Sequence, residues 1–249
     1  MSISQESKDR VAIEELYDLL RFQAGGKLDT NSLPTLTDIL KGRIPEKGVY
    51  YFFEPSETRR GRTELRVTRV GTHAVSEGAK STLRTRLRTH AGTAALSGNH
   101  RASIFRLHVG AALQSKTDAA SPTWGVGSSA DQITRFAESS IEKLVSQSLR
   151  EMRVVLVDVS DTASAHSDRA FIERNSIGLL SSVGRDIDSP SVDWLGNFSP
   201  RLEIRKSGMW NLNHLSHSTD QRFLETLTKC VMHPGGQDSY GPSNWWTSL

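Results

Sequence analysis

Apolar side chains repeat with helical spacing near the start of the chain. Residues 6–22 carry five of them on one helical face: Val11, Ile13, Leu16, Leu19 and Leu20. Gly25-Gly26 then ends the predicted helix, and a short second helix is expected around residues 36–40. The pattern predicts an N-terminal helical extension over residues 1–45.

Two segments with strand-like patterns follow this extension. Residues 48–54 (GVYYFFE) are a run of large and β-branched side chains between turn-forming residues, which is typical of a buried strand. Residues 65–70 alternate apolar and polar side chains with period two. We expect the two strands to pair across a polar hairpin loop at residues 57–63.

Three helices are predicted after these strands. Ser81 is expected to cap a helix over residues 82–90, and residues 103–113 favour a helix, although their β-branched content leaves a strand open. A long helix is predicted from residue 131 to about residue 152. Its inward face is expected to hold Ile133, Phe136, Ile141, Leu144, Val145 and Leu149.

The last regular elements are a strand and a helix. Residues 154–159 are apolar except for Asp158 and are typical of a central strand, and residues 169–182 predict a helix capped by Ser167 or Asp168. The remainder is rich in loops and isolated aromatic residues, so we expect it to cover the sheet. The order of the elements predicts a small sheet flanked by helices.

Composition excludes several protein classes. No apolar run approaches the roughly 18 residues that span a bilayer, and the N-terminus lacks the uninterrupted apolar stretch of a signal peptide. A single cysteine, Cys230, excludes an internal disulfide framework and a cysteine-rich zinc site. These features predict a cytoplasmic protein with no membrane partner.

Positive charge is concentrated in one segment of the chain. Residues 57–110 contain eleven basic and three acidic residues, a net charge of +8, so the rest of the chain carries −5 of the total of +3. Ten of the eleven are arginine, whose planar guanidinium pairs with phosphate through two hydrogen bonds. A solvated arginine-rich surface and a site for a polyanion both agree with this charge.

Three motifs occur in a fixed order within these elements. Gly48-Val-Tyr50 lies on the first strand, Arg69-Val-Gly71 ends the second, and Thr82-Leu-x-x-Arg86-Leu-x-x-His90 occupies the next helix. The later strand and a helix bearing Glu173 complete the series. In this order, residues 46–183 resemble the GIY-YIG nuclease superfamily. The resemblance implies an α+β fold with a small, mainly antiparallel three-stranded sheet flanked by helices, and residues 184–249 then form a C-terminal extension packed on that domain.

The resemblance also implies roles for individual residues. Tyr50 corresponds to the first motif tyrosine, which orients or deprotonates the attacking water, and Arg86 to the arginine that stabilises phosphate charge. Glu173 corresponds to the Mg²⁺ ligand, with Mn²⁺ as a substitute, and one carboxylate suits an ion that keeps most of its waters. His90 lies four residues after Arg86, so it shares the same helix face and is a further catalytic candidate.

Each of these residues has a structural alternative. Tyr50 is also a packing residue of an aromatic strand, and His90 is also a surface or capping histidine. Glu173 lies among apolar neighbours, where a carboxylate is unfavourable unless a cation accompanies it. Arg174 or Arg169 could supply that cation through a salt bridge, in place of Mg²⁺.

The second motif departs from the family pattern. Arg69 stands in place of the YIG tyrosine, and Thr72-His73 follow the glycine where related nucleases often carry a lysine. His73 or Arg69 is a candidate to replace the missing groups, so His73 joins the catalytic candidates. Seven residues are expected to contact nucleic acid: Arg69, Arg84, Arg88, Asn99, His100, Arg101 and Asn197.

Three functions agree with the sequence. The favoured one is a Mg²⁺-dependent endonuclease that cleaves DNA, and double-strand cutting by one site would suggest a homodimer. The second is a catalytically weakened GIY-YIG-like module that only binds nucleic acid. The third is a scaffold whose basic face binds an acidic protein.

Overall fold

The computed structural model describes residues 4–117, 120–220 and 222–236, so the last part of the predicted C-terminal extension, 237–249, lies outside the described residues. The N-terminal half contains α1 (Gln5–Gln23), α2 (Leu36–Lys41), β1 (Gly48–Thr58), β2 (Leu65–Gly71), α3 (Leu83–Ala91), η1 (His100–Ala102) and α4 (Ile104–Thr117). The rest contains α5 (Gln132–Ala137), α6 (Ser139–Glu151), β3 (Arg153–Asp158), α7 (Asp168–Leu180), η2 (Leu195–Phe198), α8 (Leu202–Ser207), α9 (Phe223–Met232) and η3 (Pro234–Gly236).

The three strands form one antiparallel sheet in the order β2-β1-β3. In the central strand β1, Tyr50 lies opposite Gly71 of β2 and Leu156 of β3. The sheet and its flanking helices confirm the predicted α+β fold.

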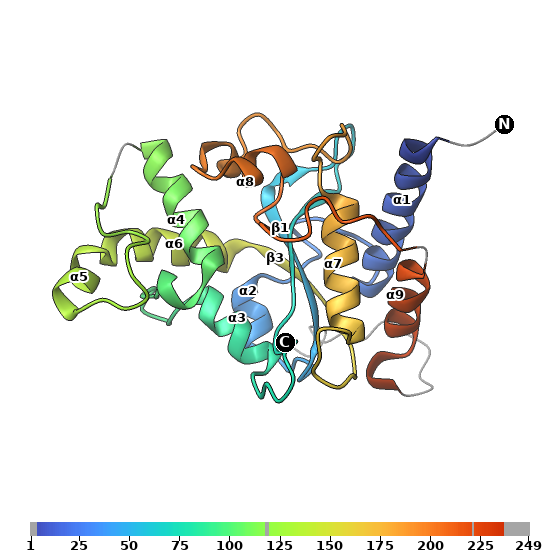
Figure 1. Cartoon of the computed structure of the whole chain (residues 1–249), viewed down its shortest axis with the longest axis horizontal. Coiled ribbons are helices and arrows are strands. Elements are labelled where there is room, and N and C mark those ends of the chain that lie inside the picture. Colours follow the sequence, from blue (N-terminus) through green and yellow to red (C-terminus); the bar gives the residue numbers. More distant parts are fainter. Residues whose placement is uncertain (1–3, 118–119, 221, 237–249) are drawn as a thin grey trace.

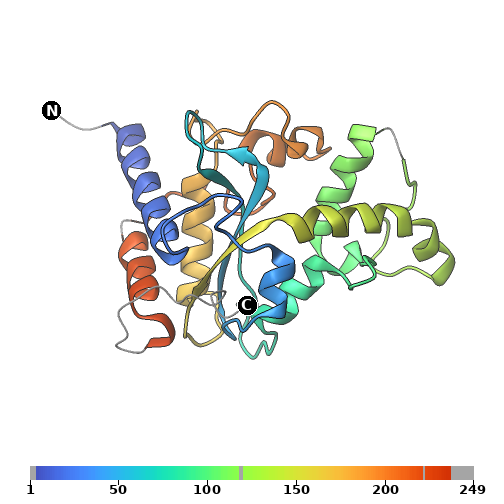
Figure 2. The same cartoon turned by 180° about the vertical axis from the view of Figure 1, so that it is seen from behind.

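Alternate side chains of β1 enter two separate cores, one on each face of the sheet. Tyr51 and Phe53 pack with apolar residues of α1, α7 and α9, while Tyr50 and Phe52 pack with those of α2, α3, α4 and α6. Figure 1 shows these two groups of helices on opposite sides of the strands, and Figure 2 shows the same division from behind. The N-terminal helix thus belongs to one core.

The segment around α8 completes the other core and covers the free edge of β2. Trp194 and Trp210 are buried there. The backbone N–H of Trp210 donates to the carbonyl of Thr68 over 2.8 Å, and the side-chain amide of Asn211 donates to the carbonyl of Val70 over 2.8 Å. Residues 208–211 therefore satisfy polar groups that an edge strand would leave open.

The prediction of one long helix from residue 131 to residue 152 is wrong. The chain bends at Glu138 between α5 and α6, and the side chain of Glu138 is buried against Arg101 in an ion pair of 2.6 Å. The bend turns α5 away from the core, so Ile133 and Phe136 are each 81% exposed rather than inward. Leu144, which was also expected inward, is 45% exposed.

Smaller differences concern the ends of elements. β1 continues to Thr58, so the hairpin loop is shorter than predicted, and Thr82 rather than Ser81 caps α3. The prediction that Val11 faces the core is wrong, because its side chain is 67% exposed. Residues 103–113 lie largely in helix α4, which settles the choice between helix and strand. Within the described ranges, no helix is both long and apolar enough to cross a membrane.

Candidate active site

The glycines of the two motifs are required by close packing around Tyr50. A Cβ atom on Gly71 would lie 2.2 Å from the Tyr50 hydroxyl oxygen, and a Cβ atom on Gly48 would lie 2.3 Å from the carbonyl oxygen of Val157. Both separations are too short for any side chain at these positions. Gly71 therefore lets the tyrosine ring lie across the end of β2, and Gly48 lets β1 approach the backbone of β3 closely.

Helix α3 places a histidine directly against this tyrosine. His90 lies on the buried face of α3 with Leu83 and Leu87, and its Nε2 atom is 3.0 Å from the hydroxyl of the fully buried Tyr50. Its Nδ1 atom is 2.8 Å from the hydroxyl of Ser103. Three side chains thus form a continuous hydrogen-bonded row beneath the end of the sheet.

The row is built for a neutral imidazole. Burial lowers the pKa of His90 well below its ordinary value, and the positive charges of Arg69, Arg86 and Arg106 lower it further. A neutral imidazole has one donor and one acceptor nitrogen. With Nδ1–H donating to Ser103, the Nε2 lone pair is free to accept the hydroxyl proton of Tyr50.

Glu173 lies on α7, on the other face of the sheet. It reaches the end of the sheet where Tyr50 lies opposite Gly71, which we call the corner. Its Oε1 atom accepts a hydrogen bond of 3.2 Å from the backbone N–H of Thr72, the residue after the second motif. Burial raises the pKa of Glu173, while Arg69, the Thr72 N–H and Arg86 act in the opposite direction. A carboxylate in such surroundings favours a cation as partner.

Arg169 and Arg174, the two arginines that the sequence offered as salt-bridge partners of Glu173, contact other groups instead. Arg169 pairs with Asp161 at 2.6 Å. Arg174 lies 5.1 Å from the ring centre of Phe171 and donates to the carbonyl of Ala165. Glu173 is held by its hydrogen bond from the Thr72 N–H, and the charges of Arg69 and Arg86 favour its ionised form.

The three arginines of α3 have different surroundings. Arg86 is half-buried and lies one turn before His90 on the same side of α3, which places it beside the corner. Its charge lowers the pKa values of His90 and Arg69 and opposes the rise in that of Glu173. Arg84 instead donates to the carbonyls of Leu40 and Gly42 over 2.8 Å and 2.6 Å, which ties α3 to α2. Arg88 is exposed to solvent.

His73 lies beside the corner in an ion-pair network at the start of α7. Its Nε2 atom is 3.2 Å from an Arg169 nitrogen, and its carbonyl accepts a bond of 2.9 Å from the same guanidinium. Burial lowers the pKa of His73 to about 4, and Arg169 lowers it as well. These contacts suit a residue that fixes the loop after β2 to α7.

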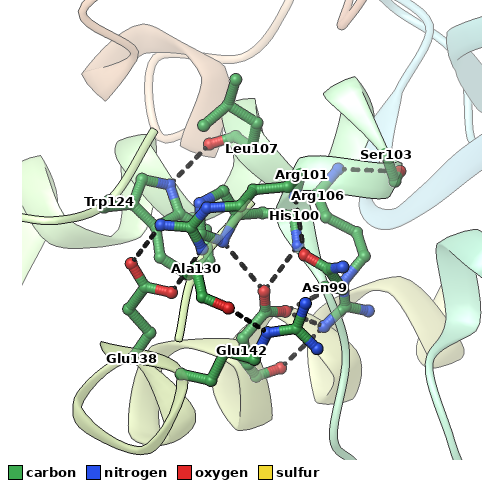
Figure 3. A network of polar contacts seen from close by, with 12 residues as sticks. Asn99, His100, Arg101, Ser103, Arg106, Leu107, Trp124, Ala130, Glu138 and Glu142 are labelled. Carbon is green, nitrogen blue, oxygen red and sulfur yellow. Dashed lines mark hydrogen bonds and ion pairs between the residues drawn. The ribbon is translucent and has the colours of Figure 1, made fainter. Parts of the chain in front are cut away.

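Three of the predicted nucleic-acid residues lie in the lobe formed by η1, α4, α5 and α6: Asn99, His100 and Arg101. Figure 3 shows them within a network of polar contacts. The His100 ring stacks on Trp124 with centroids 3.9 Å apart and places Nδ1 3.0 Å from Glu142. The Arg101 guanidinium pairs with Glu138, and the Arg101 backbone N–H donates to the side-chain oxygen of Asn99. These contacts give all three residues a structural role.

Asn197 also has a structural position. Its side-chain amide donates to the carbonyls of Ser191 and Val192, each over 3.0 Å. It closes the turn before α8, and its contact with nucleic acid stays a prediction.

The basic segment is largely neutralised within the fold. Acidic residues from outside residues 57–110 pair with several of its arginines: Glu14 and Asp188 with Arg59, Glu138 with Arg101, Glu142 with Arg106, and Asp186 with Arg60. Glu57 from within the segment pairs with the buried Arg66. The net charge of +8 therefore overstates the positive surface that a polyanion would meet.

The carboxylate of Glu173 fits a metal ion of one particular kind. Among the described residues, no group of three or more His, Cys, Asp or Glu side chains is placed to hold a metal ion. One carboxylate, with waters and phosphate oxygens supplying the remaining ligands, suits Mg²⁺ better than ions that need several protein ligands. Glu173 therefore fits the role that the resemblance implies.

The antiparallel sheet, the two motif glycines and the cluster at the end of β2 define a GIY-YIG-type α+β domain. A family model described as GIY-YIG domain matches residues 7–235, so the chain belongs to the GIY-YIG domain family. The match includes most of the predicted N-terminal and C-terminal extensions. No curated protein and no solved structure matches the chain. Membership in the family indicates a nuclease-type function.

Two residues of the corner were not predicted from the sequence. Ser103 binds His90, and its position at the start of α4 was the available signal. Trp210 contacts Arg69 through its backbone carbonyl, and nothing in the local sequence marks that contact.

Proposed function

We propose that this protein is a metal-dependent endonuclease that hydrolyses DNA phosphodiester bonds at the corner formed by β1, β2, α3 and α7. The observation that carries the proposal is the contact of Tyr50 with a neutral His90 beside Arg86 and Glu173. These side chains come from three elements, with Tyr50 on β1, Arg86 and His90 one turn apart on α3, and Glu173 on α7. Their convergence supports a reaction site rather than ordinary packing.

Tyr50 and His90 orient the attacking water. When the Tyr50 hydroxyl donates to His90 Nε2, its oxygen can still accept hydrogen bonds, from the neighbouring Arg69 and from a water molecule. The bond from the water orients that water for attack on phosphorus. Ser103 keeps the ring in the required tautomer.

Arg86 and Glu173 stabilise the negative charge that develops on the phosphate, Arg86 directly and Glu173 through a metal ion. The Arg86 guanidinium binds non-bridging phosphate oxygens and stabilises the charge that grows on them, with no change of its own protonation. Glu173 would hold Mg²⁺, or Mn²⁺ in its place, and the bound ion supplies Lewis-acid stabilisation at the phosphate and the leaving oxygen.

Cleavage of a supercoiled plasmid with Mg²⁺ or Mn²⁺ tests this proposal. We expect wild type to nick or linearise the plasmid, and Glu173→Ala and Arg86→Ala to lose about 100-fold or more of the rate. Arg135→Ala is the control, since it removes an exposed arginine from another helix, α5. Equal rates in wild type and both site variants would contradict the proposal.

The replacement of the second motif tyrosine by Arg69 favours one alternative function. A GIY-YIG-like module that has lost catalysis would bind nucleic acid with strong salt dependence and leave every substrate intact. Its binding would respond little to Glu173→Ala. Where cleavage of both strands is observed, a homodimer is the simplest arrangement for a single-site enzyme, and light scattering of the complex tests it.

A further inference from the structure

Arg69, at the position of the second motif tyrosine, differs from the other buried arginines. Among the described residues, five arginines are at most 6% exposed: Arg59, Arg66, Arg69, Arg106 and Arg169. Four of them pair with a carboxylate, as Arg66 does with Glu57 at 3.1 Å. For Arg69, no carboxylate of the described chain lies within the 4.0 Å of an ion pair.

Neutral contacts hold the Arg69 guanidinium in place. One terminal nitrogen donates to the carbonyl oxygen of Trp210 over 2.9 Å, and the guanidinium carbon lies 4.5 Å from the ring centre of Phe105. Such contacts fix the position of the group and leave its charge unneutralised. The side chain is therefore oriented without being paired.

Trp210 is itself held firmly by the sheet. Its indole N–H donates to Glu54 Oε1 over 2.7 Å, and the same oxygen accepts the indole N–H of Trp194 at 2.7 Å. Its backbone N–H is bonded to Thr68. The buried Glu54 thus anchors residues 208–211 to β1, and this segment in turn positions Arg69.

A second unpaired arginine, Arg86, lies one turn before His90 on the same side of α3. The buried Nε atoms of Arg69 and Arg86 both lack a hydrogen-bond partner within the described part of the chain. Burial lowers the pKa of Arg69, and the charge of Arg86 lowers it further, while Tyr50 and Glu173 act in the opposite direction. Arg86 also has no ion pair among the described residues. Two cations in partly desolvated surroundings are costly unless an anion joins them.

We propose that Arg69 and Arg86 together bind one phosphodiester group of the substrate, and that residues 208–211 are the segment that holds Arg69 in place for it. This inference rests on the proposed nuclease function and adds a second phosphate-binding cation to it. At the position where family members carry a tyrosine, this chain then supplies fixed positive charge.

The first test measures DNA affinity and cleavage in matched variants. Arg69→Gln removes the charge, Arg69→Lys keeps it, and Arg60→Gln removes an exposed arginine that pairs with Asp186 at the far end of the hairpin. Affinity for a mixed-sequence duplex is measured without divalent metal across a range of salt, and cleavage is measured with Mg²⁺. Circular dichroism and chemical denaturation confirm that each variant folds.

We expect the slope of log K against log salt to become shallower by about 0.9 in Arg69→Gln, the value for one phosphate contact. It should stay at the wild-type value in Arg69→Lys and Arg60→Gln. Cleavage should fall about 100-fold in Arg69→Gln. An unchanged slope in Arg69→Gln overturns the inference, as does cleavage within about threefold of wild type. If wild type does not cleave DNA, the nuclease proposal fails, and the slope still decides whether Arg69 binds phosphate.

A second measurement on wild type covers the case in which Arg69→Gln does not fold. The side-chain Nε–H resonances of Arg69 and Arg86 are followed by NMR during addition of dimethyl phosphate, with neutral trimethyl phosphate as the control. Shifts of both resonances with the diester alone support the inference. Absence of a shift at Arg69 overturns it.

Discussion

Two regions of this molecule are rich in arginine and histidine, and they differ in how their charges are paired. In the lobe of α4, α5 and α6, Arg101 pairs with Glu138, and Glu142 binds both Arg106 and His100 (Figure 3). At the corner of the sheet, Arg69 and Arg86 have no ion pair among the described residues. Within the same part of the chain, the Thr72 N–H is the only hydrogen-bond partner of Glu173. Paired charges hold a scaffold together, whereas unpaired ones remain available to a substrate.

The comparison predicts opposite effects of mutations in the two regions. Removing a charge from the lobe should destabilise the fold with little direct effect on chemistry. Removing one from the corner should abolish activity with little cost in stability, because the native corner already carries unfavourable charge.

The largest loss of stability is expected for Glu142→Ala. Burial alone would raise the pKa of Glu142, but His100 and Arg106 hold it below its usual value, so the native state contains a well-paired carboxylate. Its removal leaves Arg106, which is fully buried, without a counterion. We expect a loss of about 3–5 kcal/mol in the free energy of unfolding.

Urea denaturation measures this effect, with Glu77→Ala as a control at an exposed acidic residue. A change below about 1 kcal/mol for Glu142→Ala would show that the lobe does not depend on its ion pairs.

A smaller loss is expected for Gly71→Ala. The added Cβ atom would lie 2.2 Å from the Tyr50 hydroxyl oxygen, so the ring must move away from His90. Overpacking of this kind typically costs about 1–3 kcal/mol. Cleavage should fall by more than the stability loss explains. Full activity of Gly71→Ala would contradict the proposed role of the Tyr50–His90 contact.

Glu173→Gln should change stability least. Burial raises the pKa of Glu173, so its charged form is disfavoured in the folded protein, and the neutral amide removes that cost. We expect the free energy of unfolding to stay within about 1 kcal/mol of wild type or to rise. A marked destabilisation in thermal and urea denaturation would assign Glu173 a structural salt bridge instead.

The stability of the fold should fall in mildly acidic solution. Burial lowers the pKa of His108 to about 4, with Arg69 and Arg201 lowering it as well, while an unfolded histidine titrates near its ordinary value of about 6.5. Between these values the unfolded chain binds more protons, so stability decreases as the pH falls from 6.5 towards 4. This residue contributes at most about 1.4 kcal/mol per pH unit in that window.

Urea midpoints between pH 7 and pH 4.5 test this expectation, and His108→Gln should flatten the curve. If the variant keeps the wild-type pH dependence, His108 does not have the lowered pKa.

The elements of the sheet could be predicted from the sequence because they depend on local patterns. β1 and β3 are apolar runs, and the motif glycines mark where Tyr50 packs. The bend at Glu138 could not be predicted, since it depends on an ion pair with Arg101, 37 residues away in the chain.

The same limit applies to the candidate site. Motif spacing identified Tyr50, Arg86, His90 and Glu173, which the fold brings to one corner. Counting charges along residues 57–110 could not separate free arginines from paired ones, because partners such as Glu14 and Glu142 lie elsewhere in the chain. The lack of a partner at Arg69 is a property of the fold.

The central claim is that the unpaired corner is a phosphodiesterase site, and one comparison tests it most directly. Plasmid cleavage with Mg²⁺ is measured for wild type, Arg86→Ala and Arg84→Ala. Both arginines lie on α3, but only Arg84 ties that helix to α2 through hydrogen bonds to backbone carbonyls. We predict that Arg86→Ala loses cleavage at unchanged stability, while Arg84→Ala loses stability through its contacts with Leu40 and Gly42 and keeps its rate when folded. Cleavage by Arg86→Ala at the wild-type rate would contradict the account.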